Sequence, residues 1–217
     1  MVAARATVRF FAGLAAVIAL AVPVRAQSGL LGPLKPAWLH HAGMLRQYMC
    51  SEGFGKLTGT GRDREAVDSM FAHAMTIADN DIADALLACA VASFDHARIN
   101  VRLGFFKLPM PLTIDSDSLA ACARAHLPSK IFLDTPPEGD RDKLQHFFGS
   151  AYVQWVTNSS GIATLLGHSV ESLEPALIEG GVDDPRDMRA NKAGQAFAIL
   201  ISSYYYVAPS VVLEMVR

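Results

Sequence analysis

Two long stretches in the second half of the chain contain no charged side chain, and they constrain the fold more than any other feature. No Asp, Glu, Lys or Arg occurs within residues 144–170 or 196–213. Polar residues such as Gln154 and Asn158 interrupt the first stretch. Unpaired polar groups are costly in lipid, so this stretch is a poor lipid-exposed span. A buried helical hairpin that turns near residues 158–161 is the better interpretation.

The second uncharged stretch leaves two possibilities open. Residues 196–213 are just long enough to cross a bilayer, which takes about 20 apolar residues. However, Pro209 lies inside this stretch, and three consecutive tyrosines occupy its middle (residues 204–206). Tyrosines in that position suit burial or an interface, so a membrane span and a packed helix both remain possible.

Polar and ionisable side chains border these stretches at helical spacing. Three pairs each share one helix face: Asp142 with His146, Glu171 with Glu174, and Asp187 with Asn191. A carboxylate one turn from a histidine can orient the imidazole and raise its basicity. We therefore predict that three helical segments bring these side chains into one polar cluster, with Gly194 allowing the helices to approach closely.

Such a cluster has two interpretations. It can be a structural clamp between helices, in a non-catalytic protein. Alternatively, it can act in an enzyme that hydrolyses an envelope lipid or glycan intermediate by acid–base or metal-dependent chemistry. The chain has no nucleophile elbow, no His-x-x-x-His pair and no cofactor fingerprint. The candidate catalytic residues are His146 as base, Asp142, Glu171 and Asp187 as acidic partners, and Asn191 as an orienting amide; the candidate ligands of a divalent metal are His146, Glu174 and Asp187.

The N-terminus has the organisation of a secretory signal peptide. Arg5 and Arg9 precede an uncharged apolar run over residues 10–22, which is short for a bilayer span. Val24-Arg25-Ala26 then supplies a small-residue cleavage site, which predicts cleavage after Ala26. An uncleaved N-terminal anchor is the alternative. We expect residues 1–26 to be a signal peptide and the mature protein to reach the periplasm or the cell envelope.

The remaining 27–217 segment is long enough for one domain with its own core. Helical periodicity predicts a mainly α, bundle-like domain with halves 27–135 and 136–217, and alternation predicts a short extended element near residues 99–112. The net charge is −2 and no basic stripe occurs, which argues against nucleic acid as a partner. The high apolar content favours a membrane or lipid surface, or a homo-oligomer, as the partner.

Local signals place several elements in the first half. We expect a helix over residues 37–50 and helical structure over 63–97, broken near residues 79–81 into two helices or one kinked helix. Ser116 or Asp117 can cap a short helix that ends at Ala125. Four glycines within residues 51–61 predict a loop there.

The three cysteines lie in the first half of the mature chain, and an oxidising compartment would allow one disulfide among them. We expect Cys50 to pair with Cys89 or with Cys122. Their spacing lacks the close cysteine pairs of a zinc knuckle. His40-His41 is a second, weaker candidate for capturing a metal ion.

The polar motifs of the second half resemble those of a known group of envelope proteins. The residues are Asp142-Lys143-x-x-His146-Phe147, Glu171-x-x-Glu174 and Asp187-x-x-Ala190-Asn191-x-x-Gly194. In that order they resemble small bacterial periplasmic or lipoprotein-like proteins of the YfiM/DUF2279 type, and more distantly VanZ-like proteins. The resemblance covers residues 142–198 and implies a role in the cell envelope without implying a particular reaction.

Overall fold

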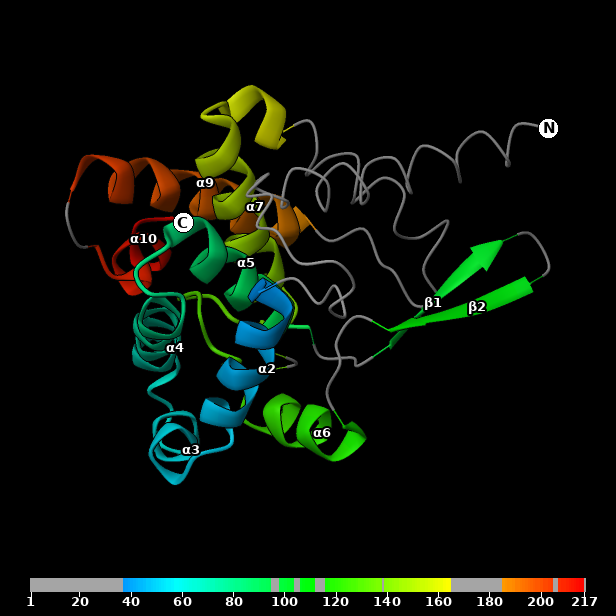
Figure 1. The fold of residues 1–217 in the computed structure, drawn as a ribbon. Helices are drawn as coiled ribbons and strands as arrows, with labels where there is room; N and C mark the ends of the chain where they lie inside the picture. Colours follow the sequence, from blue (N-terminus) through cyan, green and yellow to red (C-terminus); the bar gives the residue numbers. More distant parts are fainter. Residues whose placement is uncertain are drawn as a thin grey trace.

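Helices make up most of the described part of the chain, as the sequence predicts. The computed structural model describes residues 37–94, 98–103, 106–111, 116–137, 139–164, 185–204 and 207–216 (Figure 1). The helices are α2 (Ala37–Met49), α3 (Glu52–Gly59), α4 (Asp63–Ile77), α5 (Ile82–Ala92), α6 (Asp117–Ala125), α7 (Lys143–Thr157), α9 (Pro185–Ser203) and α10 (Pro209–Met215). A helical turn over residues 160–164 follows α7.

The short extended element is an antiparallel hairpin. Strand β1 (Arg98–Leu103) pairs with β2 (Phe106–Pro111), with Arg98 opposite Pro111 and Leu103 opposite Phe106. Figure 1 shows this hairpin to one side of the helices. The alternation of apolar residues over 99–105 thus predicts the position of this element.

The prediction of a loop over residues 51–61 is wrong, because helix α3 occupies most of this segment. Ser51 caps the helix: its side-chain oxygen accepts a hydrogen bond from the backbone N–H of Phe54. The Phe54 ring is fully buried against the rest of the core. A capped first turn and one buried aromatic side chain therefore outweigh the poor helix propensity of the glycines.

The break near residues 79–81 is a tight turn between two separate helices. Asp79 and Asn80 adopt positive φ values of 50° and 63°, and these residue types tolerate the left-handed conformation best after glycine. Asp81 then caps α5 by accepting a hydrogen bond from the N–H of Asp84. The short helix after Ser116 is likewise capped as expected, by the Ser116 hydroxyl and the N–H of Leu119.

One continuous hydrophobic core contains residues from both halves of the chain. At its centre the Phe147 ring packs edge-on against Phe148 at 5.0 Å and lies 5.4 Å from Phe197. Phe71 of α4 contacts the same group, with its ring centroid 5.1 Å from that of Phe197. Edge-to-face aromatic pairs add to the free energy gained from burial. Helices α4, α7 and α9 are therefore joined through one aromatic cluster.

A buried arginine joins α2 to the end of α5. Arg46 is only 1% exposed, and its guanidinium donates hydrogen bonds to the backbone carbonyls of Val91, Ala92 and Phe94. The last carbonyls of a helix lack partners within it and carry a partial negative charge. Arg46 on α2 therefore supplies hydrogen-bond donors to the backbone carbonyls at the C-terminal end of α5, although the two segments are about 46 residues apart in the chain.

The described residues contain no helix that is long and apolar enough to cross a membrane. The uncharged tail instead divides between the end of α9 and the short helix α10, which begins at Pro209. In the first half, Cys50 forms a disulfide with Cys122, and Cys89 is a buried free thiol. The structure thus selects one of the two expected pairings.

Candidate functional site

Helices α7 and α9 cross closely at Gly194, and this crossing positions the polar residues of the candidate site. A Cβ atom on Gly194 would overlap the backbone carbonyl of Phe147 and lie 3.1 Å from the backbone nitrogen of Ala151. No other residue fits such a contact, since every other side chain begins with a Cβ atom. The predicted role of Gly194 in close helix approach is therefore confirmed.

At the N-terminal ends of both helices, Lys143 lies in a buried ion cluster. Its ammonium pairs with Asp142 and lies 2.8 Å from Asp187 Oδ1. Only 3% of the Lys143 side chain and 4% of the Asp187 side chain are exposed. His146 Nε2 lies 3.4 Å from the same Asp187 oxygen. The structure thus brings together Asp142, His146 and Asp187 as predicted, around a lysine that the sequence analysis did not assign to the site.

Asp142 occupies the N-cap position of α7, but its side chain makes no capping hydrogen bond and pairs with Lys143 instead. The carboxylate beside His146 comes from the other helix, at Asp187. Burial raises the pKa of Asp187, while the nearby His146 and Lys143 oppose that rise. Burial thus disfavours the ionised form of Asp187, and the ammonium of Lys143 beside it favours that form.

Asn191 lies one turn further along α9 and faces α7. Its side-chain oxygen accepts a hydrogen bond of 2.6 Å from the Ser150 hydroxyl, and both residues are buried. Because a buried amide needs partners, this bond ties the two helices together next to Gly194. Asn191 therefore belongs to the same helix interface as Asp187, in a position suited to a clamp.

Two arginines of α9 extend the polar interface to the connector before α7. Arg186 pairs with Asp140, a carboxylate with no exposed surface that also accepts the backbone N–H of Phe132. Arg189 donates two hydrogen bonds to Asp134, at 2.9 and 2.6 Å, and stacks over the Phe132 ring at 4.4 Å. No local sequence signal predicts these pairs, because they join residues about fifty positions apart.

The remaining predicted site residues are not tested by the structure. Glu171 and Glu174 lie outside the described residues, so their place in a catalytic or metal-binding set stays a prediction. Lys143 argues against a metal ion at Asp187. Its ammonium already neutralises the negative charge of the Asp187 carboxylate, which a metal cation would otherwise neutralise. His41 of the second candidate pair has a carboxylate partner: its Nδ1 lies 2.9 Å from Asp84 on α5.

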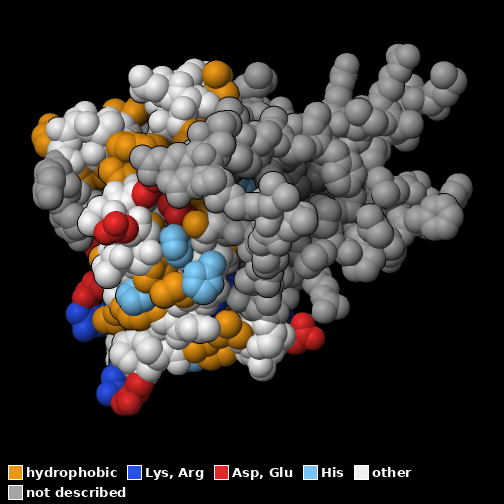
Figure 2. All heavy atoms as spheres, viewed as in Figure 1, with side chains coloured by type: hydrophobic (Ala, Val, Ile, Leu, Met, Phe, Trp, Pro, Cys, Tyr) orange, Lys and Arg blue, Asp and Glu red, His pale blue; other side chains and the backbone are white. Residues whose placement is uncertain are grey.

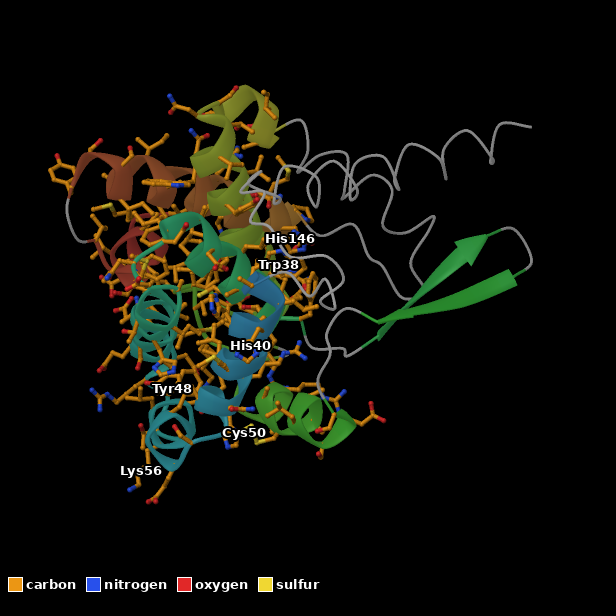
Figure 3. All side chains as sticks on the ribbon, in the orientation of Figure 1. Trp38, His40, Tyr48, Cys50, Lys56 and His146 are labelled. Atoms are coloured by element: carbon orange, nitrogen blue, oxygen red, sulfur yellow. A yellow bond between two sulfur atoms is a disulfide. The ribbon has the colours of Figure 1, made fainter. Side chains whose placement is uncertain are left out.

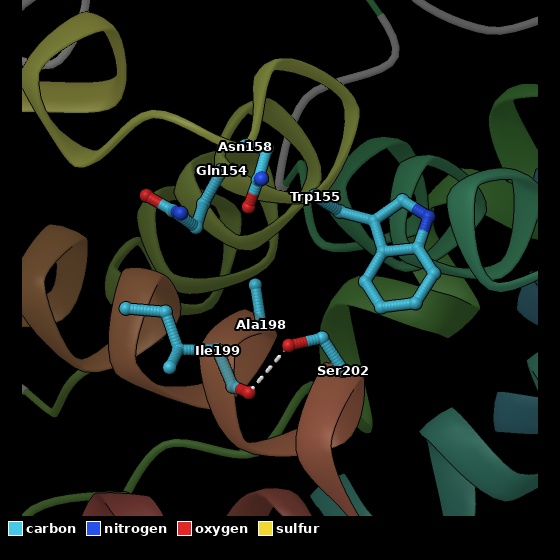
Figure 4. A pocket seen from close by; sticks show the side chains of 6 residues that line it. All are labelled: Gln154, Trp155, Asn158, Ala198, Ile199 and Ser202. Atoms are coloured by element: carbon cyan, nitrogen blue, oxygen red, sulfur yellow. Dashed lines mark hydrogen bonds between the residues drawn. The ribbon is translucent and has the colours of Figure 1, made fainter.

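The opposite ends of α7 and α9 form an uncharged end of the molecule, which we define as residues 151–164 and 196–204. A pocket of about 200 Å³ opens there between the two helices (Figure 4). The Ser202 hydroxyl in its wall donates to the carbonyl of Ile199 rather than into the pocket. The residues that line it are Gln154, Trp155, Asn158, Ala198, Ile199 and Ser202.

Large apolar side chains are exposed around this pocket. Ile199 is 47% exposed, Ile162 45% and Tyr204 62%, and Val156 is exposed as well. Figure 2 shows orange and white atoms over the tip formed by residues 151–164, with no red or blue on the face in view. The uncharged end therefore combines exposed apolar surface with an absence of acidic, basic and histidine side chains.

The chain matches no known protein family, no curated protein and no solved structure.

Proposed function

We propose that this protein is an exported, non-catalytic helical protein of the cell envelope, which attaches to a lipid surface through its uncharged end. The observation that supports attachment is the set of exposed apolar side chains, Val156, Ile162, Ile199 and Tyr204, in two segments without Asp, Glu, Lys, Arg or His. Lipid excludes charge at all positions, whereas protein interfaces usually have a polar and charged rim. The signal-like N-terminus supports export.

The aromatic content of this end fits a membrane–water boundary. Trp155 lines the pocket and Tyr204 projects from the end of α9. Tryptophan and tyrosine are enriched at the depth of lipid headgroups because their rings are apolar and their tips are polar. The exposed aliphatic side chains between them would insert among the acyl chains.

Attachment can be tested by co-sedimentation of the purified full chain with vesicles of phosphatidylethanolamine and phosphatidylglycerol. We expect the wild-type protein to sediment with the vesicles and Ile199→Glu to bind about tenfold more weakly, since burial of an isoleucine contributes about 1.5–3 kcal/mol. Leu133→Glu is the matched control. Leu133 is 65% exposed but lies in the connector beside the other end of α9.

Two results would contradict the attachment. One is a wild-type protein that stays in the supernatant. The other is an equal loss of binding in Leu133→Glu and Ile199→Glu, which would mean that general surface hydrophobicity causes the sedimentation. Concentration-dependent dimerisation without lipid, abolished by Ile199→Glu, would instead assign the uncharged end to a second copy of the chain.

We further propose that the ion cluster of Lys143, Asp187 and His146 is a clamp that fixes the packing of α7 on α9. Removing one member of a buried ion pair leaves the other charge without compensation, which costs about 3–5 kcal/mol. Lys143→Met and Asp187→Asn should each lower the free energy of unfolding, and the double variant should lose less than the sum of the two.

The enzyme alternative predicts a different result. In that case His146→Gln leaves stability unchanged, and divalent cations raise the melting temperature of the wild-type protein more than that of Asp187→Asn. Metal analysis of the purified protein, together with melting curves with and without Zn²⁺, Mg²⁺ and Mn²⁺, distinguishes the enzyme from the clamp.

Strict additivity of the losses in unfolding free energy of Lys143→Met and Asp187→Asn would refute the clamp.

A further inference from the structure

Three potential metal ligands meet where α2, α3 and α6 come together, away from the uncharged end. Cys50 follows the end of α2, and Cys122 and His126 lie one turn apart at the end of α6. One ligand atom from each of the three residues lies within 4.8 Å of those of the other two. Figure 3 shows Cys50 at this junction, next to α6. No other such group of cysteine, histidine and acidic residues occurs in the described part of the chain.

We propose that this junction is a redox-controlled metal site, in which the reduced Cys50 and Cys122 bind a thiophilic divalent cation such as Zn²⁺ together with His126. In the oxidised protein the two cysteines form the disulfide and the site is closed. Two thiolates and one imidazole are a ligand set that zinc accepts, with the fourth position left to water.

His126 Nδ1 already lies near the distance from Cys122 Sγ that two ligands of one metal ion would have. The two atoms are 3.8 Å apart. In a tetrahedral site with Zn–S near 2.3 Å and Zn–N near 2.0–2.1 Å, a sulfur and a nitrogen ligand are about 3.6 Å apart. Nδ1 also lies 3.0 Å from the Cys122 carbonyl oxygen, so metal binding would replace that hydrogen bond, and Cys50 and Cys122 would have to separate after reduction by rotation of their side chains.

The start of α3 lies against the site and holds the imidazole in place. Cys50 directly precedes Ser51, the N-cap of α3. The His126 ring packs against the first turn of α3, where a Cβ on Gly55 would lie 3.1 Å from its Cδ2 atom. All three residues are half-buried rather than enclosed, which leaves a route for a metal ion and a reductant.

The chemistry balances with a dithiol as reductant. The Cys50–Cys122 sulfur–sulfur bond breaks, the two sulfurs of the dithiol form a disulfide, and its two protons pass to the cysteine thiols. Binding of Zn²⁺ then releases those two protons to solvent as both thiolates coordinate the metal. Thiol–disulfide exchange with a disulfide as oxidant reverses the sequence: the Cys50–Cys122 bond forms, the oxidising disulfide is reduced to a dithiol with two protons taken from solvent, and the ion is released.

The test uses the full chain, reduced with dithiothreitol, freed of reductant without oxygen and titrated with Co²⁺. We expect one Co²⁺ per chain, with thiolate-to-metal charge-transfer absorption and tetrahedral d–d bands, and none in the oxidised protein. His126→Gln keeps both cysteines and should weaken binding by about tenfold or more. The matched controls are His40→Gln, which removes an exposed histidine, and Cys89→Ala, which removes the buried free thiol.

Several outcomes would overturn the proposal. They are the absence of stoichiometric Co²⁺ in the reduced protein, equal affinity in His126→Gln and wild type, or loss of binding in Cys89→Ala. If the reduced chain loses its helical circular dichroism, one equivalent of Zn²⁺ should restore it in the wild type and not in His126→Gln. Failure of Zn²⁺ to restore it also overturns the proposal.

Discussion

Gly194 sets the distance between α7 and α9, because the Phe147 carbonyl occupies the position of its missing side chain. Replacement by alanine should force the helices apart and lower the free energy of unfolding by about 1–3 kcal/mol, the usual cost of overpacking. Gly149 on α7 is the matched control, since a Cβ there meets nothing within 4 Å. Gly149→Ala should stabilise the protein by about 0.5–1 kcal/mol. Urea unfolding of both variants measures the difference, and equal effects would contradict the close contact.

Tyr152 gives the protein a specific sensitivity to high pH. Burial, with a contribution from Asp84, raises the pKa of this phenol to about 12, against about 10 in an unfolded chain. Its contribution to stability is therefore complete below pH 10 and is lost as the pH rises from 10 towards 12, because the unfolded state releases the proton first.

Replacing Tyr152 by phenylalanine should flatten the fall in melting temperature between pH 10 and 12, measured at half-unit steps from about pH 9 to 12. Tyr204→Phe removes a tyrosine that is 62% exposed and should leave the slope unchanged. If Tyr152→Phe melts with the same pH dependence as the wild type, Tyr152 does not contribute to alkaline unfolding.

At the scale of elements, α3 depends on one cap and one anchor. Ser51→Ala removes the acceptor for the N–H of Phe54 and should cost about 1 kcal/mol. Ser51→Asp keeps an acceptor at the same position and should retain most of the stability. Chemical denaturation followed by far-UV circular dichroism distinguishes the two variants. An equal loss in both would mean that the capping bond does not stabilise α3.

The helices of residues 63–92 and 117–125 could be predicted because their signals are local. Apolar residues at three- and four-residue spacing mark the buried faces, and Asp81 and Ser116 cap the helices through bonds to residues three positions on. Helix α3 could not be predicted in the same way. Its stability comes from the burial of Phe54 against elements distant in the sequence. The local sequence, which is rich in glycine, gives no sign of that burial.

At the scale of the whole molecule, the Cys50–Cys122 disulfide joins residues 72 positions apart. Closing a loop of that length in the unfolded chain corresponds to about 4 kcal/mol on the chain-entropy model. Reduction should therefore lower the urea midpoint markedly. Cys50→Ser should reproduce that loss and be insensitive to reductant, while Cys89→Ala should keep its response to reductant. A wild-type midpoint unchanged by reduction would contradict the pairing.

The sequence by itself determined the helical class, the position of the extended element and the break in the helical pattern near residues 79–81. Each depends on spacing or on interactions within a few residues. The tertiary structure decided that this break is a turn between two helices, and that Gly194 meets Phe147 of α7. Only the tertiary structure decided that Lys143 lies between Asp142 and Asp187, that Asn191 bonds Ser150, and that Cys122 rather than Cys89 pairs with Cys50. The physical reason is that these choices depend on which side chains are buried together, and α9 and α6 approach their partners from more than forty residues away.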